Sequence, residues 1–204
     1  MCALVLAACS HIPPPVRKIA LAAPFEGRQR QIGYDAFPAL RMAVREHIAA
    51  NANSALSPYQ ITFIAYNDNA DAAFAQQVAH NVVIDPDTLV VIGHLLPQTT
   101  RVAQPIYQQA GLPMIVLDDT LTDCAHGVFH FAASPDQLTQ VQPNIGAHYR
   151  EVSGGPPPGE SSTTVYLAAQ YALRAIDSAT QQDRQPTRAG VTRVLAQQAG
   201  CSKK

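Results

Sequence analysis

The chain has 204 residues, of which 47% are apolar and 14% are charged, and its formal net charge is -1. This length suits one domain with a short appendage, and the apolar fraction is enough for a buried core. The near-neutral charge, without an extended basic cluster, argues against nucleic-acid binding. No run of 18 apolar residues is present, so the sequence predicts no membrane-spanning helix.

Apolar strand patterns and helical patterns alternate from residue 17 to residue 131. In chain order, we expect a strand at 17–24, a helix at 32–50 that Pro38 kinks, a strand at 60–66, a helix at 70–83, a strand at 89–92, a helix that ends at Gly111, and strands at 114–117 and 127–131. In the helix at 70–83, Ala73, Phe74, Val78 and Val82 are predicted to point inward. This order predicts an α/β fold, a doubly wound (Rossmann-like) parallel sheet flanked by helices.

The pattern weakens after residue 135. A helix at 136–152 is interrupted by Pro143, a Pro/Gly-rich stretch follows, and two further helices are expected at 163–180 and 186–199. We therefore divide the chain into a leader remnant, a tether, an α/β lobe, a linker and C-terminal helices that pack on the lobe, with the ranges 1–9, 10–16, 17–150, 151–162 and 163–204.

The first nine residues form a short apolar segment that ends in a cysteine. Leu6-Ala7-Ala8-Cys9 resembles the bacterial lipobox, in which the cysteine is lipidated and becomes the mature N-terminus. This interpretation predicts an extracytoplasmic lipoprotein anchored through Cys9, with the Pro-rich residues after it as a tether. The alternative is an apolar N-terminus with a chance cysteine.

Two other cysteines, Cys124 and Cys201, are available as a pair if Cys2 is removed and Cys9 is lipidated. In an exported protein they could form a disulfide that holds the C-terminus to the loop after the fourth strand. The cysteine and histidine spacings match no zinc motif, and we expect neither a metal nor a cofactor.

The segment 89–120, a strand, a crossover helix and a strand, places two polar turns at one edge of the sheet. These turns are His94–Thr100 and Asp118–Thr120. Ligands of open α/β sheets bind outside the carboxyl ends of the strands, so we expect a site there.

Several passages resemble one family in the right order. They are Lys18-IALAAPFEG, the helix GYDAFPALRMAVREHIAAN at 33–51, YNDNADAAFAQQVA at 66–79, VIGHLLPQTTRVAQPIYQQAGLPMI at 91–115, and AAQYALRAI at 168–176. Together they resemble the type 1 periplasmic binding proteins, in the leucine/isoleucine/valine-binding family of ABC-transporter substrate-binding lipoproteins. Members with two lobes are roughly twice as long, above the usual size of one domain. The resemblance therefore implies one lobe, with most of the second lobe missing.

The resemblance also implies the site residues. The family binds the α-carboxylate of an amino acid at the turn after the third strand, through hydroxyl and amide groups at a helix start, which align with Thr99 and Thr100. Its second ligand turn aligns with Asp118, Asp119 and Thr120. His94 and Leu95 align where the backbone of the family comes close to the ligand, and Phe25 aligns with the loop after the first strand. The alternatives are that Thr99 and Thr100 cap the helix and that the two aspartates form a solvated turn. The aspartates would repel a carboxylate and attract an ammonium group.

We therefore expect a solute-binding protein of an ABC transporter, which captures an amino acid or a similar small polar solute, couples to a permease if that link is retained, and is not an enzyme. Without a second lobe to cover the ligand, binding should be weak or lost. One alternative is a single-lobe interaction or regulatory protein without a small ligand. Another is a small enzyme that uses Asp118 and Asp119 with His94, but no phosphate loop or nucleophile elbow accompanies them.

Overall fold

The computed structural model describes residues 13–117, 126–155 and 157–200, and among them five strands form one parallel sheet. The sheet order is β2-β1-β3-β4-β5. The strands are β1 (Val16–Ala23), β2 (Gln60–Asn67), β3 (Thr88–Gly93), β4 (Met114–Val116) and β5 (Val128–His130). The helices are α1 (Arg30–Ala50), α2 (Ala72–Ile84), α3 (Pro97–Gln109), α4 (Pro135–Ser153), α5 (Glu160–Asp183) and α6 (Arg188–Gln198). The predicted doubly wound α/β fold is confirmed.

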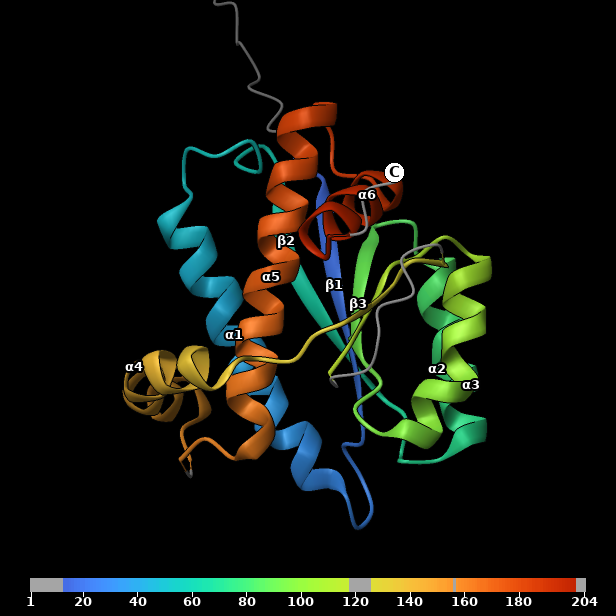
Figure 1. Ribbon diagram of the computed structural model, residues 1–204, viewed down its shortest axis with the longest axis vertical. Coiled ribbons are helices and arrows are strands. Elements are labelled where there is room, and N and C mark those ends of the chain that lie inside the picture. Colours follow the sequence, from blue (N-terminus) through green and yellow to red (C-terminus); the bar gives the residue numbers. More distant parts are fainter. Residues whose placement is uncertain (1–12, 118–125, 156, 201–204) are drawn as a thin grey trace, which may run out of the picture.

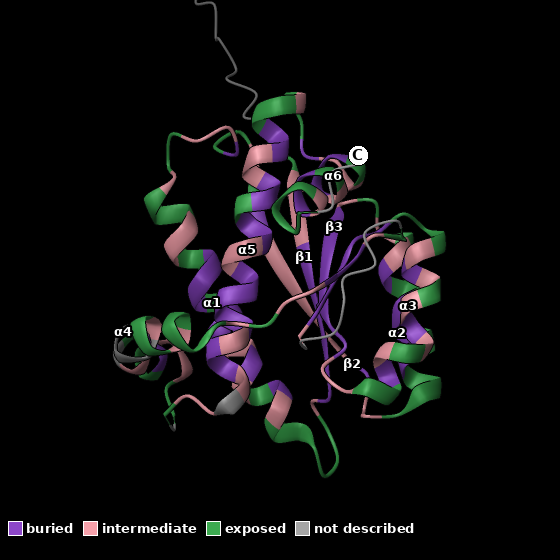
Figure 2. Ribbon diagram, viewed as in Figure 1, coloured by how far each residue is buried: buried purple, intermediate pink, exposed green. Residues whose placement is uncertain are grey.

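Helices cover both faces of the sheet. Figure 1 shows α2 and α3 on one side of the strands, and α1, α4 and α5 on the other, with α6 beside the end of α5. Successive strand residues point to opposite faces, so Ile19 and Leu21 join the core beneath α1 and α5, while Ala20 and Ala22 join the core beneath α2 and α3. The central strands are buried on both faces, which is why their sequences are continuous apolar runs (Figure 2).

Two local predictions differ from the structure. Ala73 and Phe74 were expected to point inward, but Phe74 is 49% exposed and Ala75 takes the buried position. Asp71 caps α2 by accepting hydrogen bonds from the N–H groups of Ala73 and Phe74, so both residues lie in the exposed first turn. The expected break at Pro143 is also absent, because α4 runs from Pro135 to Ser153.

The connection between α4 and α5 is shorter than the Pro/Gly-rich stretch in the sequence. α4 continues to Ser153 and α5 begins at Glu160. Within the described residues, none of the helices has both the length and the apolar character needed to cross a membrane.

Candidate functional site

A cavity of about 260 Å³ lies at the carboxyl end of the sheet, where β3, β4 and β5 meet the start of α3. Because all five strands are parallel, the loops that follow them converge at this edge. The cavity is lined by His94, Leu95, Leu96, Pro97, Thr100, Arg101, Gln104, Val116, Leu117 and His130. The site predicted from the strand-helix-strand pattern and the cavity therefore occupy the same edge.

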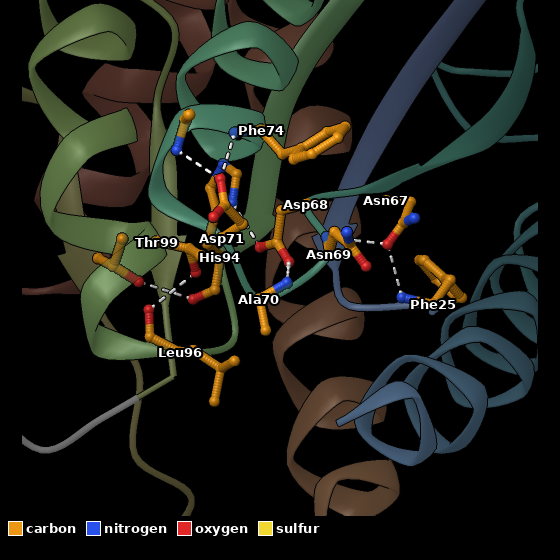
Figure 3. A network of polar contacts seen from close by, with 12 residues as sticks. Phe25, Asn67, Asp68, Asn69, Ala70, Asp71, Phe74, His94, Leu96 and Thr99 are labelled. Atoms are coloured by element: carbon orange, nitrogen blue, oxygen red, sulfur yellow. Dashed lines mark hydrogen bonds and ion pairs between the residues drawn. The ribbon is translucent and has the colours of Figure 1, made fainter. Parts of the chain in front are cut away.

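The turn after β2 is tied to the loop after β1 (Figure 3). Asn67 Oδ1 accepts hydrogen bonds from the N–H groups of Phe25, at 2.8 Å, and Asn69, at 2.9 Å. Asp68 is fully buried, and its backbone N–H donates to the carbonyl of Ala23. These bonds hold the first two loops together beside the third.

Asp68, His94 and Tyr107 form a buried chain of hydrogen bonds. His94 Nδ1 lies 2.7 Å from Asp68 Oδ2, and His94 Nε2 lies 3.1 Å from the Tyr107 hydroxyl. Burial raises the pKa of Tyr107 well above its usual range, so the phenol keeps its proton beside Nε2. A carboxylate accepts hydrogen bonds, so His94 Nδ1 is the donor to Asp68. The side chain of His94 therefore stabilises the turn, and only the rest of the residue is available to the cavity.

Gly93 fixes the geometry at the end of β3. Its φ is +106°, and a Cβ atom there would lie 2.2 Å from the carbonyl oxygen of Ala22 on the neighbouring strand. Only glycine fits both constraints. This close approach of two strands positions His94 and the turn that follows.

The two threonines at the start of α3 differ in their placement. Thr99 is fully buried and its hydroxyl donates to the carbonyl of Leu96, whereas Thr100 lines the cavity and its hydroxyl donates to the carbonyl of His94. Leu96 is the N-cap residue of α3 and its side chain makes no cap hydrogen bond. Both hydroxyls therefore stabilise the turn by donating to backbone carbonyls, and Thr100 is the one that also lines the cavity.

The donors suited to an anion are backbone amides rather than these hydroxyls. The N–H groups of Thr99 and Thr100 both donate to the carbonyl of Leu96. By contrast, the N–H groups of Leu95 and Leu96 have no hydrogen-bond acceptor in the described part of the chain. Free amides at a helix start favour a negatively charged group.

One face of α3 lines the cavity. Its residues, Pro97, Thr100, Arg101 and Gln104, have the spacing of a single helical face. Arg101, Gln104 and, on β5, His130 were not singled out in the sequence. Helical periodicity counted from Thr100 would have indicated Arg101 and Gln104.

Phe25 lies beside the edge but does not line the cavity. Its ring makes edge-to-face contacts with Tyr34 and Phe37, at centroid distances of 6.2 Å and 6.4 Å. Gly33 permits this packing, because a Cβ atom there would lie 2.3 Å from the carbonyl oxygen of Pro24.

Several predicted residues lie outside the described part of the chain. They are the second ligand turn, Asp118, Asp119 and Thr120, the lipidation candidate Cys9, and the disulfide candidates Cys124 and Cys201. Among the residues that are described, no three His, Cys, Asp or Glu side chains are grouped in a way that could hold a metal ion.

Comparisons with known proteins agree with this architecture. No family model matches the chain. Over 98 residues, it is 32% identical to the Leu/Ile/Val-binding protein of Escherichia coli (strain K12), and the match covers 48% of this chain and 26% of that protein. The protein of Escherichia coli O157:H7 matches equally well. Over these 98 residues the chain is therefore similar to the Leu/Ile/Val-binding proteins, and the match covers 48% of this chain.

Solved structures with this fold include several branched-chain amino acid binding proteins. A possible leucine/isoleucine/valine-binding protein from Rhodopirellula baltica SH 1 superposes with a TM-score of 0.67 at 12% identity, covering 92% of this chain and 88% of that chain. The leucine binding protein LivK from Thermotoga maritima gives 0.58 at 10% identity, covering 88% and 87%. At these identities the likeness establishes the fold alone.

The family consists of extracytoplasmic solute-binding proteins of ABC transporters and not of enzymes. This agrees with the expectation of solute capture without catalysis. The sequence match spans only about a quarter of the curated relatives' length. For this chain, the activity and partners of a whole binding protein are therefore proposals.

Proposed function

We propose that this chain captures an amino acid or a similar small polar solute outside the cytoplasm, as part of an ABC-transport system. The observation that carries this proposal is the cavity at the carboxyl edge of the sheet, at the start of α3, where the N–H groups of Leu95 and Leu96 have no acceptor among the described residues. The volume of about 260 Å³ is at the small end for ligand sites and suits a compact solute.

The ligand contacts divide between donors and acceptors. The amides of Leu95 and Leu96 bind a carboxylate, and the lone pairs of Thr100 accept from an ammonium group. Asp118, Asp119 and Thr120 follow Leu117 directly in sequence, and the family resemblance supports their role at the second turn. Thr99, His94 and Phe25 contribute by holding the turn and the neighbouring loop in place.

We further propose that the chain is a lipoprotein anchored through Cys9 and that residues 10–16 tether the lobe to the membrane. The lipobox-like Leu6-Ala7-Ala8-Cys9 and the Pro-rich segment after it support this proposal. An ABC permease is the partner that family membership suggests. A disulfide between Cys124 and Cys201 is compatible with an extracytoplasmic location.

Titration of the isotope-labelled protein with L-leucine, L-isoleucine and polar amino acids, followed by NMR, tests the capture of a solute. We expect shifts confined to residues 93–104, 116–120 and 130, with α4 as an internal control. Dissociation constants should be weaker than about 1 μM because the described residues enclose one side of the ligand. Sub-micromolar affinity would contradict the weak-binding prediction. No shift with any amino acid at about 10 mM would contradict capture itself.

The second candidate is an interaction lobe without a small ligand. Tyr34 and Phe74 are 56% and 49% exposed, and both lie in the first turns of helices that start at the carboxyl edge of the sheet. Exposed aromatic residues are common at protein interfaces. Self-association in sedimentation experiments, weakened by Phe74→Ser, would favour this candidate over solute capture.

A further inference from the structure

Arg101 is the positively charged residue among the described residues that line the cavity, and none of those lining residues is an aspartate or a glutamate. Asp118 and Asp119, proposed above at the second turn, follow Leu117 in the sequence and lie outside the described residues. The nearest carboxylate of the buried network, that of Asp68, is already engaged by His94 Nδ1 at 2.7 Å. The amino end of α3 and the free amides of Leu95 and Leu96 add to the positive character.

The guanidinium of Arg101 has no partner in the part of the chain that the structure describes. Other arginines are used structurally: Arg17 pairs with Asp87, and Arg188 donates to the carbonyls of Thr88, Val83 and Asp85. Arg101 is itself an exposed residue, and its place on α3, one residue after Thr100, puts it on the helical face that lines the cavity. A guanidinium in such a position suits a carboxylate.

The rest of the lining suits a short carbon chain. Leu95, Val116 and Leu117 provide apolar walls between the turn and the face of α3. A branched aliphatic side chain would contact these walls but leave the guanidinium without a partner. A ligand with a second anionic group would satisfy it.

Building on the proposed function, we propose that Arg101 determines specificity and that the cavity prefers an amino acid with an anionic side chain, of the class of glutamate, over branched-chain amino acids. One carboxylate is held by the amides of Leu95 and Leu96, and the distal carboxylate pairs with Arg101. The methylene groups between them lie against the apolar walls.

L-glutamate and L-glutamine are the probes that test this proposal, because they have nearly the same shape and differ in the charge of the distal group. Their dissociation constants are measured by NMR titration with the full chain. We expect glutamate to bind about tenfold more tightly than glutamine, as one charge-assisted hydrogen-bond pair allows. In Arg101→Gln this preference should disappear while glutamine binding stays within about twofold. Glutarate then reports whether the α-amino group adds to binding.

Arg41→Gln is the matched control, since Arg41 lies on α1, which covers the other face of the sheet, and has no ion-pair partner among the described residues. It should keep the full preference for glutamate. Because the Arg101 side chain makes no hydrogen bond or ion pair with another described residue, Arg101→Gln should also unfold at the same temperature as the parent chain.

The outcomes separate the two proposals. Equal affinity for glutamate and glutamine, or a preference that survives Arg101→Gln, would overturn the role of Arg101 while solute capture stands. Leucine binding more tightly than glutamate would do the same. The absence of shifts with every probe would overturn solute capture, and this inference with it.

Discussion

His94 connects three elements through two hydrogen bonds. Its Nδ1 reaches Asp68 at the end of β2, and its Nε2 reaches Tyr107 on α3. Asp68 Oδ1 also accepts the N–H of Ala70, so the carboxylate is used at both oxygens. Buried polar groups of this kind are stabilising only while every member is satisfied. The network therefore makes the turn that lines the cavity dependent on a residue that never touches it, Tyr107.

Tyr107→Phe removes the hydroxyl and leaves His94 Nε2 without its partner. We expect a loss of about 1–3 kcal/mol in the free energy of unfolding, because a buried polar atom loses its hydrogen bond. Chemical denaturation measures this loss. Tyr34→Phe is the control, since Tyr34 is 56% exposed, and it should change stability by no more than about 0.5 kcal/mol. Equal stability of both variants and the parent chain would contradict a stabilising network.

Packing between α1 and α5 joins segments far apart in the chain, and it buries polar as well as apolar atoms. His47 Nε2 on α1 and Asp177 Oδ1 on α5 are buried without a hydrogen-bond partner in the described part of the chain, while Asn51 lies 3.3 Å from His47 Nδ1. Burial lowers the pKa of His47 below its usual range, and Arg174 lowers it further, although Asp177 acts in the opposite direction. The folded chain therefore favours neutral His47.

The free energy of unfolding should decrease as the pH is lowered, because His47 is held neutral in the folded chain. A histidine in the unfolded chain titrates near pH 6.5, so below that pH the unfolded state binds a proton more readily than the folded state does. The contribution of neutral His47 is thus present above about pH 6.5 and is lost as the pH falls toward the lower folded pKa. We expect His47→Gln to lose less unfolding free energy than the parent chain between about pH 7.5 and about pH 5.5.

His80→Gln, at an exposed position on α2, provides the control and should follow the parent chain across this range. Urea denaturation at both pH values measures the difference. An equal loss in His47→Gln and the parent chain would show that protonation of His47 is not coupled to folding.

The hydrophobic core of the whole molecule includes the C-terminal helices, which follow the fifth strand in the sequence. Side chains of α5, among them Val165, Leu173 and Ile176, are almost completely buried in the same hydrophobic cluster as Ile19 of β1 and Leu40 of α1. Removing α5 would expose that face of the sheet. The C-terminal helices are therefore part of the core and not an appended unit.

A chain shortened to end at Gly155 should fail to fold cooperatively, because the apolar face of the sheet and α1 would lose its cover. Thermal unfolding followed by circular dichroism, with the full chain as reference, measures this. A single sharp transition in the shortened chain would mean that residues up to 155 form an independent lobe.

The sequence by itself determined the strands and most of the helices. Short continuous apolar runs such as 89–92, which end at glycine, favour buried strands between two helical layers. The 3.6-residue periodicity of α1 and α5 is clear despite Pro38. It also located the edge at which the cavity lies, because parallel strands place their following turns together. The first turn of α2 was misjudged, since capping by Asp71 exposes Phe74 although the residue is apolar.

Only the tertiary structure decided which polar groups near the cavity have hydrogen-bond partners and which have none among the described residues. Asp68 and His94 are 26 residues apart, and no local pattern shows that they meet, or that Thr99 and Thr100 donate to carbonyls of their own turn. The same is true of Leu95, Leu96 and Arg101 beside the cavity, whose amide or guanidinium groups have no partner within the part of the chain that the structure describes. Hydrogen bonding depends on distances set by packing of the whole sheet, whereas strand and helix periodicity is set by neighbouring residues.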